Sequence, residues 1–424
     1  MSKKSIKKSL LLLALSAIML FAMSITATAA TNATITGLKQ VSGYETSVRV
    51  SWNAAPSADL KGYYVYFSTD GVNFARLSTS QYPDAYSAEA GISGLSAGNK
   101  YYVKVAACYD AGNYTYVAGP ISNAISVVTA PKSVDYKTII QTNATTSNIS
   151  CKWTGSYGAS GYVVTLGTTT TTVSATSATL KQAAGNYNYC KVQAFKQSNE
   201  GFRAYAGNSA SVTMYSAPKK PIKVASAKYG TIKWQPTESN KVKIGWDMPT
   251  GYTSTTDGFQ IQIYSINGKK KLKTYNIANK YTYYKEFNIS SVKNKGFKVR
   301  VRAYKNVAGK KCYGSWSSFK AVVPQAAVKI QDRVSYTSFR AVWPKIKNVK
   351  KYYVYVCKNE NVAQKDQVWK KVATLGSNAT SYVAKNLKVG KYNAIYVIPV
   401  VKVGGKTYKA EATWYKYTYM SSYY

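Results

Sequence analysis

The chain has 424 residues and a formal net charge of +41, with 57 lysines and arginines against 16 aspartates and glutamates and no histidine. A chain without histidine cannot build a serine–histidine–aspartate triad, a cysteine–histidine pair or a histidine-ligated metal site. The acids are scattered singly, with no pair in a glycosidase-like motif. We therefore expect no enzymatic activity, no metal and no cofactor. The length suits two to four ordinary domains.

The N-terminal segment has the layout of a secretory signal peptide. Four lysines within the first eight residues precede an apolar run at 10–23, and small residues follow at 27–30. A transmembrane anchor is the weaker alternative, because the run is shorter than the ~20 residues that span a bilayer. We expect residues 1–30 to be removed, the protein to be exported, and the mature chain to have no transmembrane segment.

One strand pattern occurs four times along the rest of the chain. It begins as GYYVYFSTDG at 62, GYVVTLGTTT at 161, GFQIQIYSING at 258 and KYYVYVCKNE at 351. Apolar and polar residues alternate with period two, which indicates half-buried strands. In the first copy, the Asp-Gly pair at 70–71 predicts a tight hairpin turn.

A strand with one tryptophan precedes each copy, and an aromatic-led strand follows it. The tryptophans are 101, 93 and 97 residues apart, a period that is too long for a solenoid and suits complete small domains. Each unit has about seven short strands and little helical periodicity, which predicts an antiparallel β-sandwich. The tryptophans that we expect in the four cores are Trp52, Trp153, Trp246 and Trp343.

These motifs resemble the fibronectin type III domain. The resemblance rests on the tryptophan of the second strand, the Gly-Tyr-x-Val third strand and GLSAGNKYYVKVAA at 94–107. CYGSWSSF at 312–319 is similar to the final strand and preceding loop of many bacterial members. The resemblance extends over 31–424 as four tandem copies. It implies an all-β chain of four tandem immunoglobulin-like (fibronectin type III) antiparallel β-sandwiches.

Proline residues mark the expected domain joints, because a proline just past the last strand cannot extend the ladder. They are Pro131, Pro218 and Pro324. After the signal peptide, the expected domains are 31–129, which is neutral, 130–216, and the strongly basic 217–324 and 325–424.

Three copies depart from the pattern in their aromatic-led strand. The second and fourth copies have one extra residue there, so Cys190, Val192 and Ala194 would face inward only if a β-bulge intervened. The third copy begins this strand with Phe297 in place of tyrosine. We expect it to lack the hydrogen bond that a tyrosine corner makes.

Five cysteines are too few for a disulfide scaffold, and none has metal-site spacing. Cys151 and Cys190 are predicted to face each other across the second sandwich. They form either two buried thiols or a disulfide, and the sequence leaves both alternatives open. It gives no basis for pairing Cys108, Cys312 or Cys357.

Forty tyrosines against ten phenylalanines show a strong preference for rings that keep a hydroxyl in water. Such rings can stabilise exposed sheet faces, or they can stack on sugars. The tryptophans that we expect at the surface, where stacking on a carbohydrate is an alternative function, are Trp234, Trp316, Trp369 and Trp414.

Basic residues are concentrated in the last two domains. Residues 217–324 hold 22 lysines and arginines against four acids, and 325–424 hold 18 against four. A charged face can simply keep an exported protein soluble, but such a field also attracts polyanions. NGKKKLK at 267–273 predicts a basic hairpin turn, and FKVRVR at 297–302 predicts basic side chains on one strand face. The candidate polyanion-binding residues are Lys269, Lys270, Lys271, Lys298, Arg300, Arg302, Lys345, Lys347, Lys350 and Lys351.

The sequence as a whole favours a secreted, non-enzymatic surface or adhesion protein that is retained at the cell surface. Its basic C-terminal half would bind an anionic cell-wall polymer, an acidic glycan or a surface protein, and its neutral N-terminal domain would be presented for protein or glycan binding. The alternative is a carbohydrate-binding protein that uses exposed aromatics. Sequence-specific nucleic-acid recognition is not expected, because no recognition helix is predicted. The lysine-rich signal and the loop style indicate a bacterial source.

Overall fold

The computed structural model describes residues 34–56, 59–225, 232–234, 241–288, 295–323, 325–412 and 415–423. The expected signal peptide and Pro324 lie outside these residues. Contacts divide the chain into two compact units, one made mostly of residues up to Met214 and the other mostly of residues from Tyr215 onward. Among the described residues, no helix is both long enough and apolar enough to cross a membrane.

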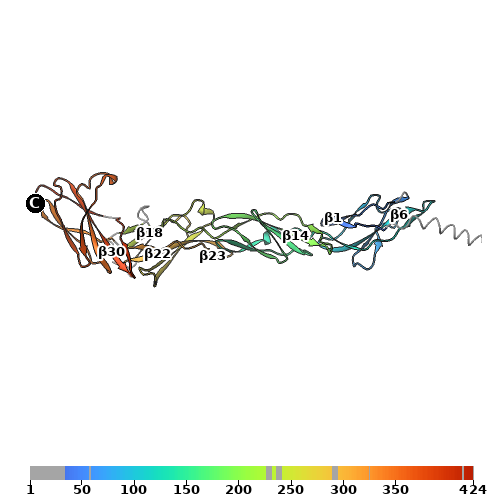
Figure 1. The fold of residues 1–424 in the computed structure, drawn as a ribbon, viewed down its shortest axis with the longest axis horizontal. Helices are drawn as coiled ribbons and strands as arrows, with labels where there is room; N and C mark the ends of the chain where they lie inside the picture. Colours follow the sequence, from blue (N-terminus) through green and yellow to red (C-terminus); the bar gives the residue numbers. More distant parts are fainter. Residues whose placement is uncertain are drawn as a thin grey trace, which may run out of the picture. The chain divides into compact units, whose positions relative to one another are not determined.

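In these ranges the strands pair into four three-stranded and four five-stranded sheets (Figure 1). The strand pairings whose registers are known are antiparallel, for example β3 with β6 and β19 with β22. The first sandwich joins sheet β1-β2-β5 to sheet β4-β3-β6-β7, with β8 beside β6. Its strands are β1 Lys39–Gly43, β2 Ser47–Ser51, β3 Leu60–Ser68, β4 Ala75–Arg76, β5 Glu89–Ser93, β6 Lys100–Asp110, β7 Tyr116–Ala118 and β8 Ile125–Val128.

The same arrangement recurs three more times. The second sandwich contains β9 Ile140–Ala144, β10 Asn148–Lys152, β11 Gly161–Leu166, β12 Thr169–Val173, β13 Ser177–Lys181, β14 Tyr187–Gln197, β15 Arg203–Tyr205 and β16 Val212–Tyr215. The third contains β17 Ile232–Trp234, β18 Lys241–Gly245, β19 Gly258–Ser265, β20 Lys271–Ile277, β21 Tyr284–Asn288, β22 Phe297–Val307, β23 Lys310–Tyr313 and β24 Lys320–Val322.

The fourth sandwich pairs sheet β25-β26-β29 with sheet β28-β27-β30-β31, and β32 lies beside β30. Its strands are β25 Lys329–Ser335, β26 Ser338–Val342, β27 Val349–Cys357, β28 Lys370–Gly376, β29 Ser381–Ala384, β30 Tyr392–Val403, β31 Lys406–Lys409 and β32 Lys416–Tyr419. Short 3-10 turns lie at Tyr136–Thr138, Tyr252–Ser254 and Gln364–Asp366. The fold expected from the sequence, four tandem all-β sandwiches, is confirmed.

Each core contains one of the four expected tryptophans, which are all buried. Each tryptophan packs against the aromatic residue near the start of the third strand, with ring centroids 5.0–5.8 Å apart. Edge-to-face and tilted packing of this kind adds to the stabilisation from burial alone. The pairs are Trp52–Tyr63, Trp153–Tyr162, Trp246–Phe259 and Trp343–Tyr352.

The tyrosine of this pair also binds the backbone of the preceding loop. The hydroxyl of Tyr63 accepts a hydrogen bond from the Ala55 amide, and that of Tyr352 accepts one from the Ile346 amide. Tyr162 makes the same bond to the second loop. Each bond satisfies a polar group that would otherwise be buried without a partner.

The aromatic-led strand is anchored differently in different copies. In the first sandwich, the Ser96 amide donates to the Tyr101 hydroxyl at 2.9 Å, as in a tyrosine corner. In the fourth, the fully buried Asn393 anchors the strand, because its amide group bonds the amide and carbonyl of Lys388 and the carbonyl of Lys391.

The prediction of a β-bulge in the second copy is wrong where β14 pairs with β11 and β15. Neither of these pairings has a register shift. Cys190, Val192 and Ala194 are all buried without it. The leading Tyr187 is 48% exposed. The alternation therefore starts one residue later, and the extra residue is accommodated at the strand end.

The tight hairpin expected at 70–71 is also wrong. Strand β3 ends at Ser68 and β4 begins at Ala75, so a longer loop joins them. Asp70 organises this loop, since its carboxylate accepts hydrogen bonds from the backbone amides of Val72 and Asn73. The amide of Asn73, followed by that of Val72, lowers the pKa of this carboxyl. Asp70 is a turn-forming residue, as the sequence indicates.

A buried side chain joins two strands of the first sandwich, since Gln40 on β1 donates to the Val128 carbonyl of β8 at 2.7 Å and accepts from the Val128 amide at 2.9 Å. A part-buried contact links the first sandwich to the second within the same compact unit. The Glu200 carboxylate accepts hydrogen bonds from both the amide and the hydroxyl of Ser126. Partial burial by itself raises the pKa of Glu200, but the hydrogen bonds from Ser126 outweigh it, so the net pKa is lowered.

Because the folded-state pKa lies below the ordinary value of 4.5, we expect the Glu200 contact to stabilise this link above about pH 4.5 and to weaken as the pH falls below it. The protection factors of the Ser126 and Asn199 amides, which correct for the slower intrinsic exchange in acid, should therefore fall as the pH is lowered. Glu200→Gln should have lower protection factors at neutral pH and lose most of this acid dependence. Glu89→Gln, which removes an exposed carboxylate, is the control. Identical pH profiles for wild type and Glu200→Gln would contradict the assignment.

Candidate functional site

The basic strand face predicted on β22 is present. Phe297, Val299 and Val301 are fully buried, and the alternating Lys298 and Arg302 face outward and are partly exposed. The period-two alternation of the strand produces this face.

The two arginines of this face form a ladder with aromatic rings. The guanidinium carbon of Arg302 lies 3.6 Å from the ring centroid of Tyr313 and 4.3 Å from that of Trp316. The guanidinium carbon of Arg300 lies 4.3 Å from the Trp316 ring and 4.9 Å from Phe319. A guanidinium over an aromatic face contributes about 0.5–2 kcal/mol. The ladder thus fixes the segment after β23 onto the sheet.

Glutamines of β19 hold the same arginines from the other side. Arg302 donates twice to Gln260 Oε1, at 3.0 and 2.7 Å, and Arg300 donates twice to Gln262 Oε1, at 3.1 and 2.7 Å. Partial burial lowers the pKa of Arg302, yet a guanidinium stays charged in a protein. These arginines therefore have a structural role, which sequence reasoning missed, and Trp316 is a rung of the ladder rather than an open stacking platform.

The lysines of the same sandwich are differently placed. Lys269 and Lys270 lie in the turn between β19 and β20, and Lys271 is the first residue of β20, one position beyond the predicted turn. All three are exposed. Tyr264 on β19 pairs with Lys271 of β20 on one side and with Lys298 of β22 on the other. The structure thus gathers the lysines of the turn with Lys298.

A second basic cluster lies on the fourth sandwich. The ammonium groups of Lys351 and Lys371 each lie 5.1 Å from the ring centroid of Tyr353. The hydrogen bond from Lys351, together with the charges of Lys371 and Lys409, lowers the pKa of Tyr353. Sequence reasoning chose Lys351 but left Lys371 and Lys409 off the candidate set, because pairing of β27 with β28 brings distant residues together.

The other predicted lysines of this sandwich lie near the start of β27. Lys345 and Lys347 are in the loop before the strand, Lys350 is its second residue, and all three are exposed. Lys345 donates a hydrogen bond to the side chain of Asn378 at 2.9 Å. Their exposure is compatible with binding a polymer.

Aromatic rings of the fourth sandwich pack on one another. Tyr355 stacks on Tyr396 at 4.9 Å, and Trp369 lies 4.6 Å from Tyr396 and 5.2 Å from Tyr415. Trp369 is half-buried, so much of its surface is already covered. This favours sheet stabilisation over sugar stacking for these rings. The side chains of Trp234 and Trp414 lie outside the described residues.

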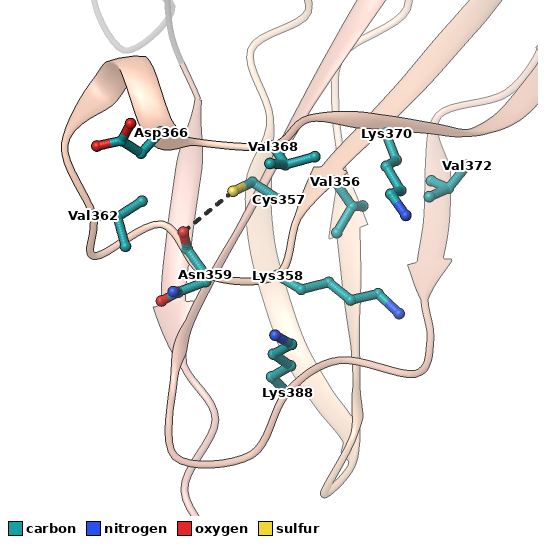
Figure 2. Close-up of a pocket in the computed structure, with 10 residues that line it drawn as sticks. All are labelled: Val356, Cys357, Lys358, Asn359, Val362, Asp366, Val368, Lys370, Val372 and Lys388. Carbon is teal, nitrogen blue, oxygen red and sulfur yellow. Dashed lines mark hydrogen bonds between the residues drawn. The ribbon is translucent and has the colours of Figure 1, made fainter.

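A cavity of about 490 Å³ opens at the end of β27 (Figure 2). Its wall combines aliphatic side chains with ammonium groups. They come from the ends of β27 and β28, from the connection between these two strands and from the connection between β29 and β30. Sequence reasoning missed this site. Its only local signal is the set of valines within the lysine-rich stretch 356–372. Its lining includes Val356, Val362, Val368, Val372, Lys358, Lys370 and Lys388.

The comparison with protein families agrees with the fold of the first sandwich. Residues 33–120 match the model of the fibronectin type III domain. A solved structure described as the crystal structure of chicken CNTN1 FN1-FN3 domains is similar at 15% identity, covering 69% of this chain and 99% of that chain with a TM-score of 0.28. The search of curated proteins found no match. Export, cell-surface retention and a bacterial source remain predictions.

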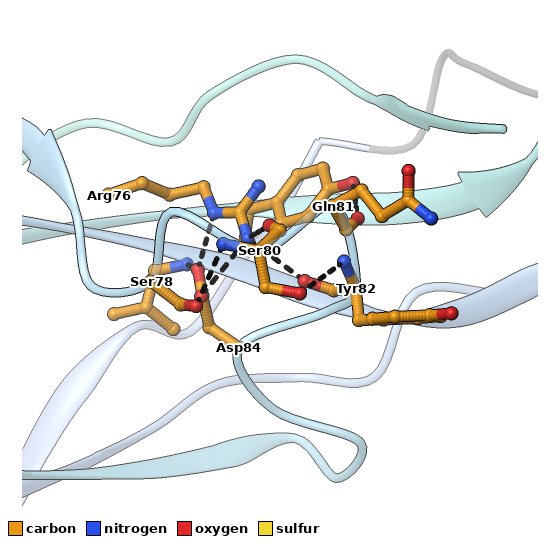
Figure 3. Close-up of polar contacts among 8 residues, drawn as sticks. Arg76, Ser78, Ser80, Gln81, Tyr82 and Asp84 are labelled. Atoms are coloured by element: carbon orange, nitrogen blue, oxygen red, sulfur yellow. Dashed lines mark hydrogen bonds and ion pairs between the residues drawn. The ribbon is translucent and has the colours of Figure 1, made fainter.

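In the first sandwich, an arginine fixes the loop after β4 (Figure 3). Arg76 Nε lies 3.2 Å from Asp84 Oδ2, and the Asp84 side chain is only 2% exposed. Arg76 also donates to the carbonyls of Ser80 and Tyr82 and lies over the ring of Tyr64. The ion pair therefore holds this loop in one shape.

Exposed tyrosines of the same sandwich lie on and beside this loop. Tyr82 is 47% exposed and its ring centroid lies 5.8 Å from that of Tyr116 on β7. Tyr86 and Tyr114 are 75% and 79% exposed. Such rings, which combine apolar area with a hydroxyl, are common at protein interfaces.

Cys151 on β10 and Cys190 on β14 lie side by side in the second core, as predicted. Both are buried free thiols, and a hydrogen bond joins them. That bond, followed by burial, raises the pKa of Cys190. The disulfide alternative stays a prediction. Among the described residues, no group of three or more cysteines and acids could hold a metal ion.

Proposed function

We propose that this protein is a secreted, non-enzymatic surface-binding protein whose third and fourth sandwiches bind an anionic polymer at the cell surface. The observation that supports it is that the arginines and the lysines of these sandwiches are placed differently. Arg300 and Arg302 are engaged in the ladder, whereas the lysines at 269–271 and the cluster around Lys351 present ammonium groups to solvent.

The charge of these two sandwiches gives the interaction its strength and range. Residues 217–324 and 325–424 have net charges of +18 and +14, while 31–129 is neutral. A surface field of one sign attracts polyanions and is screened over about 8 Å at physiological ionic strength. The chemistry suits a cell-wall phosphate polymer or an acidic glycan. With the domain boundaries expected from the sequence, the neutral first domain is left to meet a protein or glycan through its exposed tyrosines.

Binding of the mature chain to immobilised lipoteichoic acid should fall steeply as salt rises. Each neutralised contact contributes roughly one unit to the slope of log K against log salt on a densely charged polymer. The triple variant Lys269→Gln, Lys270→Gln, Lys271→Gln should therefore bind more weakly, with a slope smaller by about two to three.

A charge-matched control is available in the second sandwich. Lys152, Lys181 and Lys191 are likewise exposed, and replacing all three with glutamine should leave the slope nearly unchanged. Equal losses in the two triple variants would contradict a localised polymer site. Salt-insensitive binding to a neutral oligosaccharide would instead support the carbohydrate-binding alternative.

A further inference from the structure

The cavity at the end of β27 combines an apolar wall with a cationic one. Val356 is buried at its base, while Val368 and Val372 are 66% and 41% exposed at its mouth. Exposed aliphatic side chains gathered at a concave site lose water contact when a ligand covers them. A volume of about 490 Å³ lies within the ~300–1,000 Å³ range of small-molecule sites.

Three lysines supply the cationic part. Figure 2 shows the Lys358 side chain extending along the pocket, with Lys370 on one side of it and Lys388 on the other. No ion pair engages any of the three among the residues that the structure describes. The one acid of the wall, Asp366, lies at the far side from Lys370, with Val368 between them.

Hydrogen bonds hold the walls of the cavity in place. Asn393 binds the backbone of Lys388 through both its amide and its carbonyl. Next to the lining residue Asn359, the Glu360 amide donates to the Tyr392 carbonyl at 2.9 Å, and the Tyr415 hydroxyl donates to the Glu360 carboxylate at 2.6 Å. Walls fixed in this way lose little conformational entropy when a ligand binds.

From these observations we propose that the cavity is a binding site for a small amphipathic anion, an aliphatic carboxylate whose chain contacts the valines and whose carboxylate lies among Lys358, Lys370 and Lys388. Charge complementarity selects an anion. The described residues that line the cavity offer no aromatic face on which a sugar ring could stack, so the aliphatic wall selects a hydrocarbon body. The site uses none of the lysines assigned to the polymer surface and goes beyond that function.

Saturation-transfer NMR on the mature chain with octanoate as the probe tests the proposal. We expect octanoate to bind with a Kd of about 1 mM or tighter. Acetate, which lacks the chain, and 1-octanol, which lacks the charge, should each bind at least fivefold more weakly. Saturating heparin should not displace octanoate, because the polymer surface lies elsewhere.

Two variants locate the site. Lys358→Gln with Lys388→Gln should weaken octanoate binding about fivefold or more, since the carboxylate loses two of its three cationic contacts. Val372→Glu, which places a carboxylate at the mouth, should abolish it. The control Lys347→Gln with Lys350→Gln removes two exposed charges outside the cavity and should leave Kd unchanged. Matching thermal unfolding curves show that the variants are folded. Undetectable octanoate binding, or equal Kd values in all variants, would overturn the proposal.

Discussion

Replacing Trp343 with alanine should lower the free energy of unfolding of the fourth sandwich by about 3–5 kcal/mol. The side chain is 4% exposed and lies in the main apolar cluster of that sandwich, with its ring centroid 5.8 Å from that of Tyr352. Its removal forfeits the burial of a large ring and leaves a cavity, because neighbouring strands can relax only partly. A loss of this size is a large fraction of the stability of an ordinary domain.

Differential scanning calorimetry of the mature chain measures this effect. One transition should move to lower temperature while the others stay in place, because the four cores are distinct. Tyr336→Ala, at a position 52% exposed in the same sandwich, should change stability by no more than about 0.5 kcal/mol. A downward shift of every transition in Trp343→Ala would show a single merged core and contradict the tandem architecture.

Arg302→Lys should destabilise the third sandwich by about 1–3 kcal/mol although it conserves the charge. Lysine has no planar fork, so it cannot lie between Tyr313 and Trp316 and also donate twice to Gln260. The acceptor on Gln260, which is 9% exposed, would then lose its main partner. Urea unfolding monitored by tryptophan fluorescence would report the change.

The matched control is Arg49→Lys, since Arg49 is exposed and makes one ion pair with Glu89 at 3.4 Å. That change should stay within about 0.5 kcal/mol. Lipoteichoic acid binding by Arg302→Lys should remain near the wild-type value once folding is accounted for. A large loss of polymer binding without a loss of stability would show that Arg302 is a ligand-binding residue rather than a rung of the ladder.

The architecture was predictable because its signals are local. The period-two alternation around Val65 and Val299 and the tryptophan of each second strand depend only on which residues a strand places on its two faces. The structure differs from the sequence prediction where pairing with a neighbouring strand determines which way a side chain faces. Cys190 faces inward because the pairing with β11 sets the register of β14, and a local count of residues predicted a bulge instead.

By itself, the sequence determined the class of fold, the four cores and the concentration of positive charge toward the C-terminal end, since composition and periodicity do not depend on distant contacts. Only the tertiary structure decided which cations are available to a ligand. The pairing of β22 with β19, and the segment that follows β23, engage Arg302 internally. Lys358 and Lys370, at the two ends of the β27–β28 connection, meet Lys388 of the β29–β30 connection at one cavity. Such groupings join residues far apart in the chain, and their neighbours are set by strand pairing and packing rather than by local order.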